Sequence, residues 1–479
     1  MYKQLALSVL LCCFSPFGFA ENNIANSLNV IQPPHSQLAI KVTDLVSGQL
    51  LFEKDANKLM VPASTQKLLT AVASAYVLGK QFTFKTQLSS AANVINGTLQ
   101  GDLFIHFNGD PTLTSEQLRQ LLRQLPKHGI NRINGAVYLV GNTSDKVQAK
   151  GWVWDDLGIC FAAPVSDFVI NKNCIKAKLK PTLASNQSQI VYPNYLPTMI
   201  STTAIFDKTS QRQFCQLELT TLPENQYHIS GCYQGNKPLP LTIAVSDPSL
   251  YVQKIVANLF EQTQIPVAQG IYVIEKSPKG LDVIATHQSK ALPELLKRVL
   301  EDSDNLIADS LFKQIGASYY QQTGTFANGA KAMKNTLSEL GVDIDHAQIV
   351  DGSGLSRYNL ITANQLAQIL TLIHTQTRFT YLNDLLAVSG KTGTLRHKPI
   401  FRRPPLQDIV SAKTGSMQGV DNLAGFIQGT DNARLLFVVL ENGLSPHEKD
   451  NQIAPFNGLF LQLLLDSQQT NSQPSPRVN

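Results

Sequence analysis

Hydrophobic and polar positions divide the chain into three stretches with different periodicity. Apolar and polar residues alternate across residues 37–53 around Gly48, which predicts a β-hairpin. Pro62 follows at a place where the first turn of a helix tolerates proline. Four apolar residues then recur at helical spacing up to Gly79, namely Leu68, Leu69, Val72 and Ala73. We therefore expect a hairpin and then a helix that begins close to Pro62.

The middle stretch, residues 85–285, has a strand-like texture. Short apolar runs at 103–107 and 136–140 alternate with turns, and Ser, Thr, Gln and Asn are plentiful. Only one amphipathic helix is expected here, at about 115–126. This stretch is predicted to be a separate β-rich region.

Long helical patterns return after residue 290. They cover 291–301, 304–322, 329–341 and 362–375. Two strand-like runs follow, 422–429 and 434–441, and then a helical stretch that ends near Leu465. Apolar residues at 456–465 could touch a membrane surface, but packing against a sheet is the commoner outcome. The pattern predicts an α+β body, formed by residues 21–84 and 286–467 and divided by the insert, with a disordered polar tail at 468–479.

The first twenty residues have the composition of an export signal. Lys3 supplies a positive start, Leu5 to Phe14 an apolar centre, and Gly18-Phe19-Ala20 a small-x-small cleavage site. The apolar centre is short for a membrane span, although an uncleaved anchor is the alternative. We expect a cleaved signal peptide at 1–20 and a periplasmic protein with at most peripheral membrane contact.

Composition limits the function classes. Of 479 residues, 43% are hydrophobic and 16% are charged, and the formal net charge is only +5. This charge is too small to indicate nucleic-acid binding. No Cys/His spacing of the zinc type occurs, so we expect neither a metal nor a cofactor.

Four cysteines remain once the signal is removed: Cys160, Cys174, Cys215 and Cys232. An even number in an oxidising compartment indicates disulfides, and four cysteines allow three pairings. Local pairing, 160 with 174 and 215 with 232, is favoured because each pair closes a short loop. The alternative is four buried thiols.

The first chemical motif is Ser64-Thr65-Gln66-Lys67. Residues three apart on a helix share a face, so the lysine amine can lie beside the serine hydroxyl. A serine hydroxyl needs a neighbouring base, and a lysine whose pKa is lowered by burial can be that base. The helix start also favours developing negative charge. Chance alone supplies such a spacing about twice in a chain of this composition.

The second motif is Ser303-Asp304-Asn305, at the start of a predicted helix. All three residue types are favoured at a helix N-cap, which is its purely structural interpretation. In a catalytic interpretation, the Ser303 hydroxyl relays a proton, and the Asn305 amide holds a lysine amine and a substrate carbonyl.

The third motif is Lys413-Thr414-Gly415-Ser416, after a β-prone run. Lys413 and Thr414 could hold a substrate carboxylate, and Gly415 lets a substrate backbone lie close to a strand. The Ser416 N–H could form an oxyanion hole with that of Ser64. A rival tripeptide, Lys391-Thr392-Gly393, lacks the first glycine that a nucleotide-binding P-loop needs.

The order of the three motifs decides between these interpretations. Ser-x-x-Lys, Ser-x-Asn and Lys-Thr-Gly occur in the order found in class A β-lactamases and penicillin-binding proteins. A second Ser-x-x-Lys, Ser310 to Lys313, follows the second motif, and Ser27-Leu28-Asn29 precedes the first, so neither fits. Tyr192-Pro193-Asn194 could mimic the tyrosine variant of the second motif, but it lies in the β-rich insert and away from a helix start.

The long interval between Ser64 and Ser303, filled by a cysteine-bearing insert, makes the resemblance specific. The chain resembles the penicillin-binding protein 4 family, the low-molecular-mass class C D-alanyl-D-alanine carboxypeptidase/endopeptidases, along nearly all of its mature length. Further stretches carry this resemblance: Gly101-Asp102-Leu103, Asp110-Pro111-Thr112-Leu113, Gly151-Trp152-Val153-Trp154-Asp155-Asp156, Asp351-Gly352-Ser353-Gly354-Leu355-Ser356-Arg357 and Ser411 to Gly419.

The resemblance implies a transpeptidase-type domain, with a five-stranded antiparallel sheet flanked by helices, interrupted by two smaller domains. It implies cleavage of peptidoglycan peptides at D-Ala-D-Ala ends and at D-Ala-meso-diaminopimelate cross-links, and inhibition by β-lactam antibiotics. Ser64 would be acylated, Lys67 would be its base, and Ser303 and Asn305 would complete the proton relay. Lys413 and Thr414 would bind the substrate carboxylate. A side pocket for the diaminopimelyl end would comprise Asp156, Phe161, Arg357 and Gln418.

Two alternatives stay open at this stage. A β-lactamase would need a base for rapid deacylation, and no Glu-x-x-Leu-Asn occurs between Ser64 and Ser303. A non-catalytic wall-binding module is disfavoured by the intact Ser64, Lys67 and Asn305. The basic segment 391–403 receives no role, and oligomeric state is not predicted.

Overall fold

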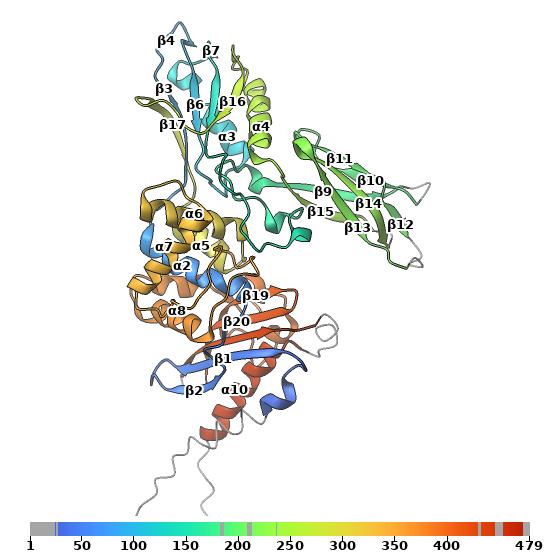
Figure 1. Ribbon diagram of the computed structural model, residues 1–479, viewed down its shortest axis with the longest axis vertical. Coiled ribbons are helices and arrows are strands. Elements are labelled where there is room, and N and C mark those ends of the chain that lie inside the picture. Colours follow the sequence, from blue (N-terminus) through green and yellow to red (C-terminus); the bar gives the residue numbers. More distant parts are fainter. Residues whose placement is uncertain are drawn as a thin grey trace, which may run out of the picture.

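The computed structural model describes residue 24 and residues 27–182, 186–207, 213–235, 237–429, 433–445 and 454–472. The predicted signal peptide lies outside the described residues. The body of the molecule is a sheet covered on both faces by helices, and a long β-rich part projects from it (Figure 1).

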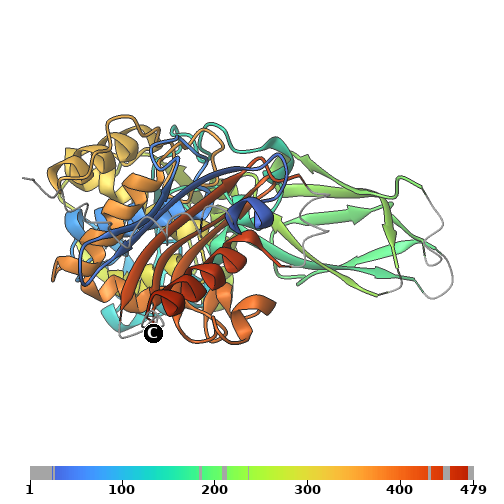
Figure 2. The ribbon, with the colours of Figure 1, turned by 90° about the horizontal axis from the view of Figure 1, so that it is seen from below.

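The central sheet joins the two ends of the chain. Its order is β18-β19-β20-β21-β1-β2, and every neighbouring pair is antiparallel. The bounds are β1 Gln37–Asp44, β2 Leu50–Lys54, β18 Ala387–Val388, β19 Val410–Met417, β20 Val420–Gln428 and β21 Arg434–Asn442. Strand β1 pairs with β21 from Gln37 opposite Asn442 to Asp44 opposite Leu435, as Figure 2 shows for the blue and red strands. The expected five-stranded sheet is therefore present, with the two-residue strand β18 added at its edge.

Alternation along the strands gives each face its own core. On β21, Leu436, Val438 and Leu440 belong to a core shared with the helices α2, α5, α6, α7 and α8. Residues Leu435, Phe437 and Val439 belong to a core on the other face, shared with helix α10. The bounds are α2 Lys67–Val77, α5 Leu292–Leu300, α6 Asn305–Tyr320, α7 Phe326–Glu339, α8 Ala363–Thr375 and α10 Phe456–Ser472.

Helix α10 confirms one expectation about the C-terminal region, its packing against the sheet, and corrects another. Its apolar residues Phe456, Phe460 and Leu464 are buried against the sheet, because the face of β1, β20 and β21 opposite the helical layer is also apolar. The helix continues to Ser472, so the predicted polar tail begins as helix, and the rest of it lies outside the described residues. None of the helices in the described part of the chain combines the length and apolar character that crossing a bilayer requires.

The chain leaves and re-enters the body on adjacent strands. Strand β3 (Lys85–Ser90) pairs antiparallel with β17 (Asp282–Gln288), which ends three residues beyond the boundary expected for the insert. Their sheet has the order β16-β8-β6-β3-β17. The remaining strands are β6 Leu103–His106, β8 Val137–Val140 and β16 Ile271–Ile274, and a small sheet is formed by β4 Val94–Ile95, β5 Thr98–Leu99 and β7 Arg132–Ile133.

Two helices cover this sheet, where only one was expected. Helix α3 (Ser115–Leu122) confirms the predicted amphipathic helix, and Thr114 and Gln117 form its capping box. Helix α4 (Pro248–Thr263) was missed. Asp247 caps it, and its buried residues, such as Tyr251 and Ile255, pack into the core of the insert.

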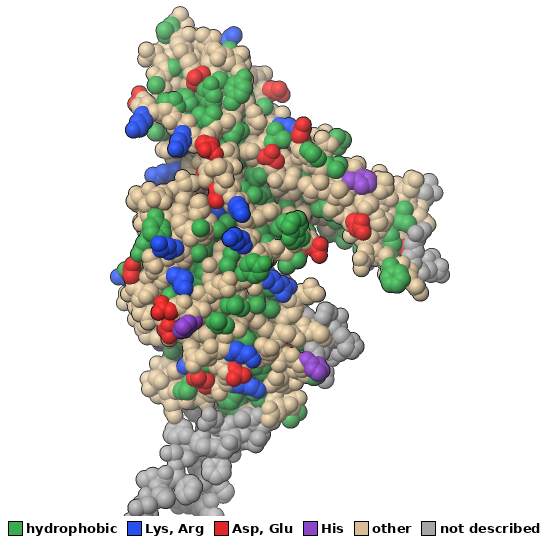
Figure 3. Space-filling model, viewed as in Figure 1, with side chains coloured by type: hydrophobic (Ala, Val, Ile, Leu, Met, Phe, Trp, Pro, Cys, Tyr) green, Lys and Arg blue, Asp and Glu red, His purple; other side chains and the backbone are tan. Residues whose placement is uncertain are grey.

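The rest of the insert forms the arm that projects to the side in Figure 1. Its sheets are β10-β9-β15, and β11-β14-β12 with β13 paired to β14. The bounds are β9 Cys174–Pro181, β10 Ser188–Val191, β11 Met199–Thr202, β12 Ile205–Asp207, β13 Leu217–Leu222, β14 Gln226–Gln234 and β15 Leu239–Ala244. On the face drawn in Figure 3, acidic and basic side chains are interspersed.

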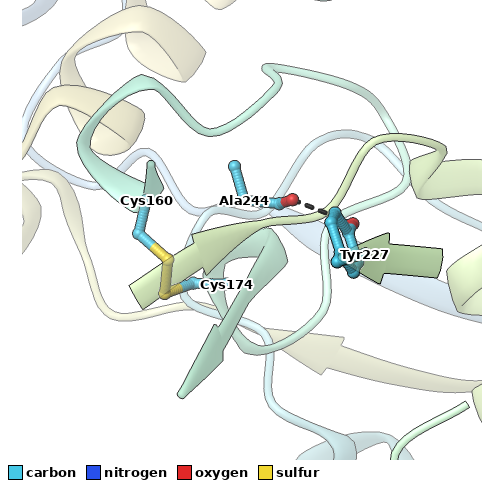
Figure 4. Close-up of a disulfide and its surroundings, with 4 residues drawn as sticks. All are labelled: Cys160, Cys174, Tyr227 and Ala244. Atoms are coloured by element: carbon cyan, nitrogen blue, oxygen red, sulfur yellow. Dashed lines mark hydrogen bonds between the residues drawn. A yellow bond between two sulfur atoms is a disulfide. The ribbon is translucent and has the colours of Figure 1, made fainter. Parts of the chain in front are cut away.

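In the part of the chain that the structure describes, the disulfides are Cys160–Cys174 and Cys215–Cys232, which is the local pairing that the sequence favours. Cys174 begins β9 and pairs with Ala244 of β15, whose carbonyl oxygen accepts a hydrogen bond from the Tyr227 hydroxyl at 2.9 Å (Figure 4). The first disulfide thus fastens the turn that contains Cys160 to the base of the arm.

Candidate active site

Ser64 lies in a 3₁₀ turn, η1 (Ala63–Gln66), that leads directly into α2. One turn later, the Lys67 side chain is buried, and its Nζ lies 2.8 Å from Ser64 Oγ. The predicted proximity of the amine and the hydroxyl is therefore present in the structure, at the junction of a 3₁₀ turn with an α-helix.

Lys67 Nζ has two further partners, and both are carbonyl oxygens. Asn305 Oδ1 and the backbone oxygen of Ser353 each lie 2.6 Å away. Burial lowers the pKa of Lys67 to about 8, while the negative charges of Asp309, Asp351 and Asp304 raise it. A neutral amine has two N–H donors and one lone pair, so two carbonyl acceptors leave the lone pair for the Ser64 hydroxyl.

The turn that holds Ser64 is clamped from the central sheet. Asn422 of β20 donates Nδ2 hydrogen bonds of 2.9 Å to the carbonyl oxygens of Val61 and Pro62. A Cβ on Gly415 would lie 2.7 Å from Pro62 O and 3.0 Å from Thr65 N. Glycine at this position of the third motif therefore lets β19 approach the turn itself, a contact that the sequence did not indicate.

A second glycine supports the turn from the opposite side. Gly354 has φ +80°, and a Cβ there would lie 1.8 Å from the carbonyl oxygen of Ala63. Ala63, directly before Ser64, has a left-handed φ of +47°, which is uncommon for a residue with a side chain. The close packing of Gly354 against Ala63 holds this backbone in place.

The second motif combines its structural and chemical interpretations. Asp304 is the N-cap of α6, since its Oδ1 accepts the Ile307 N–H at 3.1 Å. Asn305 is the first residue of the helix and directs Oδ1 toward Lys67. Ser303 has φ +63°, and its Oγ accepts a hydrogen bond of 2.9 Å from Lys413 Nζ.

The third motif lies on β19, with Lys413 fully buried. Its Nζ donates to Ser303 Oγ and to the Thr414 carbonyl oxygen, each at 2.9 Å. Burial lowers the pKa of Lys413 well below its ordinary value, and the positive charges of Lys67 and Lys398 lower it further. A bound anion would relieve this destabilisation of the ammonium form.

The segment that begins with the rival tripeptide Lys391-Thr392-Gly393 reaches the third motif at Thr394. Thr414 Oγ1 donates to Thr394 Oγ1 at 2.8 Å, and the Thr394 N–H donates to Glu301 O at 3.1 Å. The Lys391 ammonium is 58% exposed and lies 3.4 Å from the Asp408 carboxylate. Thr394 of the previously unassigned basic segment therefore contacts the site, whereas Lys391 pairs with a carboxylate away from it.

The four residues of the expected side pocket come from four separate turns. Arg357 Nη1 donates to the backbone oxygen of Gln418 at 2.8 Å, and the Phe161 carbonyl oxygen accepts from Asn305 Nδ2 at 2.9 Å. Burial raises the pKa of Asp156, and the charge of Arg357 opposes that rise. Arg357 is thus close to both Gln418 and Asp156, and Phe161 is connected to the second motif.

Sequence reasoning missed Ser353, Asp309, Asn422 and Thr394 as members of the site. Ser353 contributes a backbone carbonyl, which no side-chain motif can reveal. Asp309 follows Asn305 by four residues, so helical spacing places both on one face of α6, and this was the available signal.

Residues 20–463 match the family described as D-Ala-D-Ala carboxypeptidase 3 (S13). The chain belongs to this family. It is therefore an enzyme of the D-Ala-D-Ala carboxypeptidase class, as the order of the three motifs predicts.

Relatives in bacteria and solved structures agree with this assignment. The D-alanyl-D-alanine carboxypeptidase DacB of Haemophilus influenzae is 33% identical over 449 residues, which are 93% of this chain and 93% of that protein. A D-alanyl-D-alanine carboxypeptidase of an Actinomadura species is 26% identical over 428 residues, covering 85% and 78% of the two chains. The crystal structure of H. influenzae penicillin binding protein 4 has a TM-score of 0.86 at 32% identity, covering 94% of this chain and all of that one. The expected fold class is confirmed.

Proposed function

We propose that this enzyme is a periplasmic serine D,D-peptidase that cleaves D-alanyl bonds of peptidoglycan peptides through an acyl-enzyme at Ser64. The observation that carries this proposal is the set of three contacts to Lys67 Nζ: the Ser64 hydroxyl and two carbonyl oxygens. This arrangement supports a neutral lysine that accepts the serine proton, since both of its N–H groups already have acceptors.

Acylation would start when Ser64 Oγ attacks the carbonyl carbon of the penultimate D-alanine and its proton passes to Lys67 Nζ. The N–H groups of Ser64 and Ser416 would stabilise the oxyanion. The tetrahedral intermediate would then break its C–N bond, and the leaving amine of the terminal residue would take a proton through Ser303. Water would hydrolyse the resulting ester and restore the Ser64 hydroxyl.

Lys413 and Thr414 would bind the terminal carboxylate of the substrate, or the carboxylate of a penicillin. Among the described residues, the buried Lys413 ammonium donates hydrogen bonds to two neutral acceptors, Ser303 Oγ and Thr414 O. A substrate carboxylate would supply the opposite charge that favours the protonated lysine. The Thr414 hydroxyl, which donates to Thr394 Oγ1 in the free enzyme, would turn its proton to the carboxylate and add a second contact.

Specificity for the diaminopimelyl end would come from Asp156 and Arg357. This end carries an ammonium and a carboxylate on one carbon, which Asp156 and Arg357 can pair with respectively. Phe161 and Gln418 would complete this side pocket. It would allow the enzyme to cleave D-Ala-diaminopimelate cross-links as well as terminal D-Ala-D-Ala bonds.

The disulfides Cys160–Cys174 and Cys215–Cys232 support an oxidising location, because such bonds persist outside the reducing cytosol. Together with the predicted signal peptide at 1–20, they favour export to the periplasm.

Mass spectrometry after incubation with penicillin tests the proposal. We expect one covalent adduct on Ser64, released slowly, and no adduct in the Ser64→Ala variant, whose thermal unfolding should match that of the wild type. Rapid turnover of penicillin would instead indicate a β-lactamase. A muropeptide dimer linked through diaminopimelate should be cleaved to monomers, and an intact dimer would exclude the endopeptidase activity.

A further inference from the structure

The loop 351–354 connects helix α6 to the helix that carries Lys67. Its three successive peptide groups are oriented alike. Each carbonyl oxygen accepts from a side chain of residues 66–70: Asp351 O from Gln66 Nε2 at 3.4 Å, Gly352 O from Thr70 Oγ1 at 2.6 Å, and Ser353 O from Lys67 Nζ at 2.6 Å. The position of the Lys67 amine therefore depends on how this loop is held.

Asp309 holds the loop from the opposite side. Its side chain is fully buried on α6, and Oδ1 accepts the N–H groups of Gly352 and Ser353 at 2.7 and 2.9 Å. The third N–H, that of Gly354, goes to Asp351 Oδ1 at 2.8 Å. The peptide between residues 352 and 353 is thus fixed at both ends, by Asp309 at its N–H and by Thr70 at its carbonyl oxygen.

Three carboxylates and one lysine face Lys67: Asp309, Asp351, Asp304 and Lys413. Asp351 accepts four hydrogen bonds, from the Gly354 and Ser356 N–H groups and the Asn359 and Trp152 side chains. Asp304 caps α6 and forms ion pairs with Lys172 and Arg298, at 2.8 and 3.3 Å.

Asp309 has fewer partners than either of these carboxylates. Asp351 and Lys67 are the charged groups that act on it, and no ion pair of Asp309 occurs in the described part of the chain. Burial raises the pKa of Asp309, and the charge of Asp351 raises it further, whereas Ser353, Lys67 and the Gly352 N–H lower it. Asp309 and the buried amine of Lys67 therefore each affect the protonation of the other.

We infer that Asp309 is a positioning residue for acylation: it fixes the Ser353 carbonyl that receives one Lys67 N–H. When it is ionised, Asp309 also stabilises the Lys67 ammonium and so contributes to the pH at which the amine becomes a base. This inference rests on the proposed function of Lys67. Asp309 does not touch Ser64 and acts only through the loop and through the amine. In this inference, the Asp-Gly-Ser-Gly loop at 351–354 is the backbone segment through which Asp309 positions Lys67.

Two substitutions separate the two parts of this role. Asp309→Asn keeps an oxygen that can accept from Gly352 and Ser353 but cannot be ionised. The acid limb of the penicillin acylation rate should then move to lower pH by roughly one unit, because the amine loses an attractive negative charge. The plateau rate should stay close to that of the wild type.

Asp309→Ala also removes the acceptor, and the plateau rate should fall roughly 10-fold to 100-fold as the Ser353 carbonyl loses its orientation. The matched control is Ser310→Ala, which removes a buried hydroxyl from the next position of α6 and should leave both the plateau and the limb unchanged.

The measurement is the rate of Ser64 acylation by a fluorescent penicillin between pH 5 and pH 10, with thermal unfolding of each variant as a check. An acid limb that does not move in Asp309→Asn would overturn the electrostatic role, and a wild-type plateau in Asp309→Ala would overturn the positioning role. If Asp309→Ala does not fold, Thr70→Val replaces it: this variant removes the hydroxyl that donates to the Gly352 carbonyl of the same peptide, and an unchanged plateau would overturn the positioning role. Failure of the wild type to acylate at Ser64 would refute the proposed function instead, so the two failures are distinguishable.

Discussion

The Asn305 side-chain amide donates a 2.9 Å hydrogen bond to the carbonyl oxygen of Phe161. The same amide accepts from Lys67 through Oδ1, so a turn of the inserted region contacts the amide that holds the lysine. Phe161 follows Cys160, whose disulfide to Cys174 fastens this turn to β9. A turn that the disulfide fixes within the insert therefore contacts, through the Phe161 carbonyl oxygen, the amide that holds Lys67.

Replacing both Cys160 and Cys174 by serine should slow acylation several-fold, because the Phe161 carbonyl would no longer fix Asn305. Loss of a disulfide that closes a 14-residue loop should also cost about 3 kcal/mol of stability. The matched control is the double serine variant at Cys215 and Cys232 in the arm, which should lose stability but keep the acylation rate. Equal rates in both double variants would contradict the connection. Labelling kinetics and thermal unfolding measure the two effects.

Acylation should depend on pH through Lys67. Its pKa of about 8 means that the neutral base predominates above pH 8, and that the rate falls about tenfold per pH unit below it. Lys67→Arg keeps the positive charge but provides no base, so the rate should fall roughly 10²-fold to 10⁴-fold on the plateau above pH 8 and should lose its dependence on pH. A pH–rate profile of penicillin labelling tests both statements. A flat wild-type profile between pH 6 and pH 9 would exclude a titrating lysine base.

Gly354→Ala should abolish acylation and destabilise the fold. The added Cβ would lie 1.8 Å from Ala63 O, so the turn that carries Ser64 would have to move, and φ +80° adds strain. Gly48→Ala is the matched control: φ is +74°, but a Cβ there meets nothing within 4 Å. The control should cost about 1 kcal/mol and retain full activity. Similar thermal unfolding of the two variants would argue against the close contact.

Thr394→Val should weaken binding of substrates through their terminal carboxylate. The variant keeps the shape of the side chain but removes the hydroxyl that accepts from Thr414, so Thr414 would lose its orientation. We expect KM for a D-Ala-D-Ala peptide to rise several-fold, with a smaller change in kcat. Lys391→Ala, in the same segment, should change neither constant because Lys391 pairs with Asp408. An unchanged KM in Thr394→Val would show that Thr394 does not contribute to substrate binding.

Periodicity and motif order predicted the fold class and the three motifs, because both signals are local in the sequence. Helix α4 was missed even though Asp247-Pro248 is a favourable helix start and its apolar residues have helical spacing; the strand-like runs around it dominated the prediction. Asp309 was missed because a single acidic residue in a helix usually faces solvent. Its significance depends on a backbone loop more than forty residues away, which only the folded structure brings beside it.

Strand β1 begins the central sheet, yet its partner β21 ends at Asn442. A chain synthesised from its N-terminus therefore carries β1, β2 and the Ser64 turn long before the strands that complete their sheet exist. The insert, in contrast, closes on itself through β3 and β17, and it can form its own core first. The Ser64 turn is held by β19 and β20, so the candidate active site can be complete only after these late strands have joined the sheet. A peptidase whose nucleophile becomes competent only at the end of folding is inactive while its chain is incomplete.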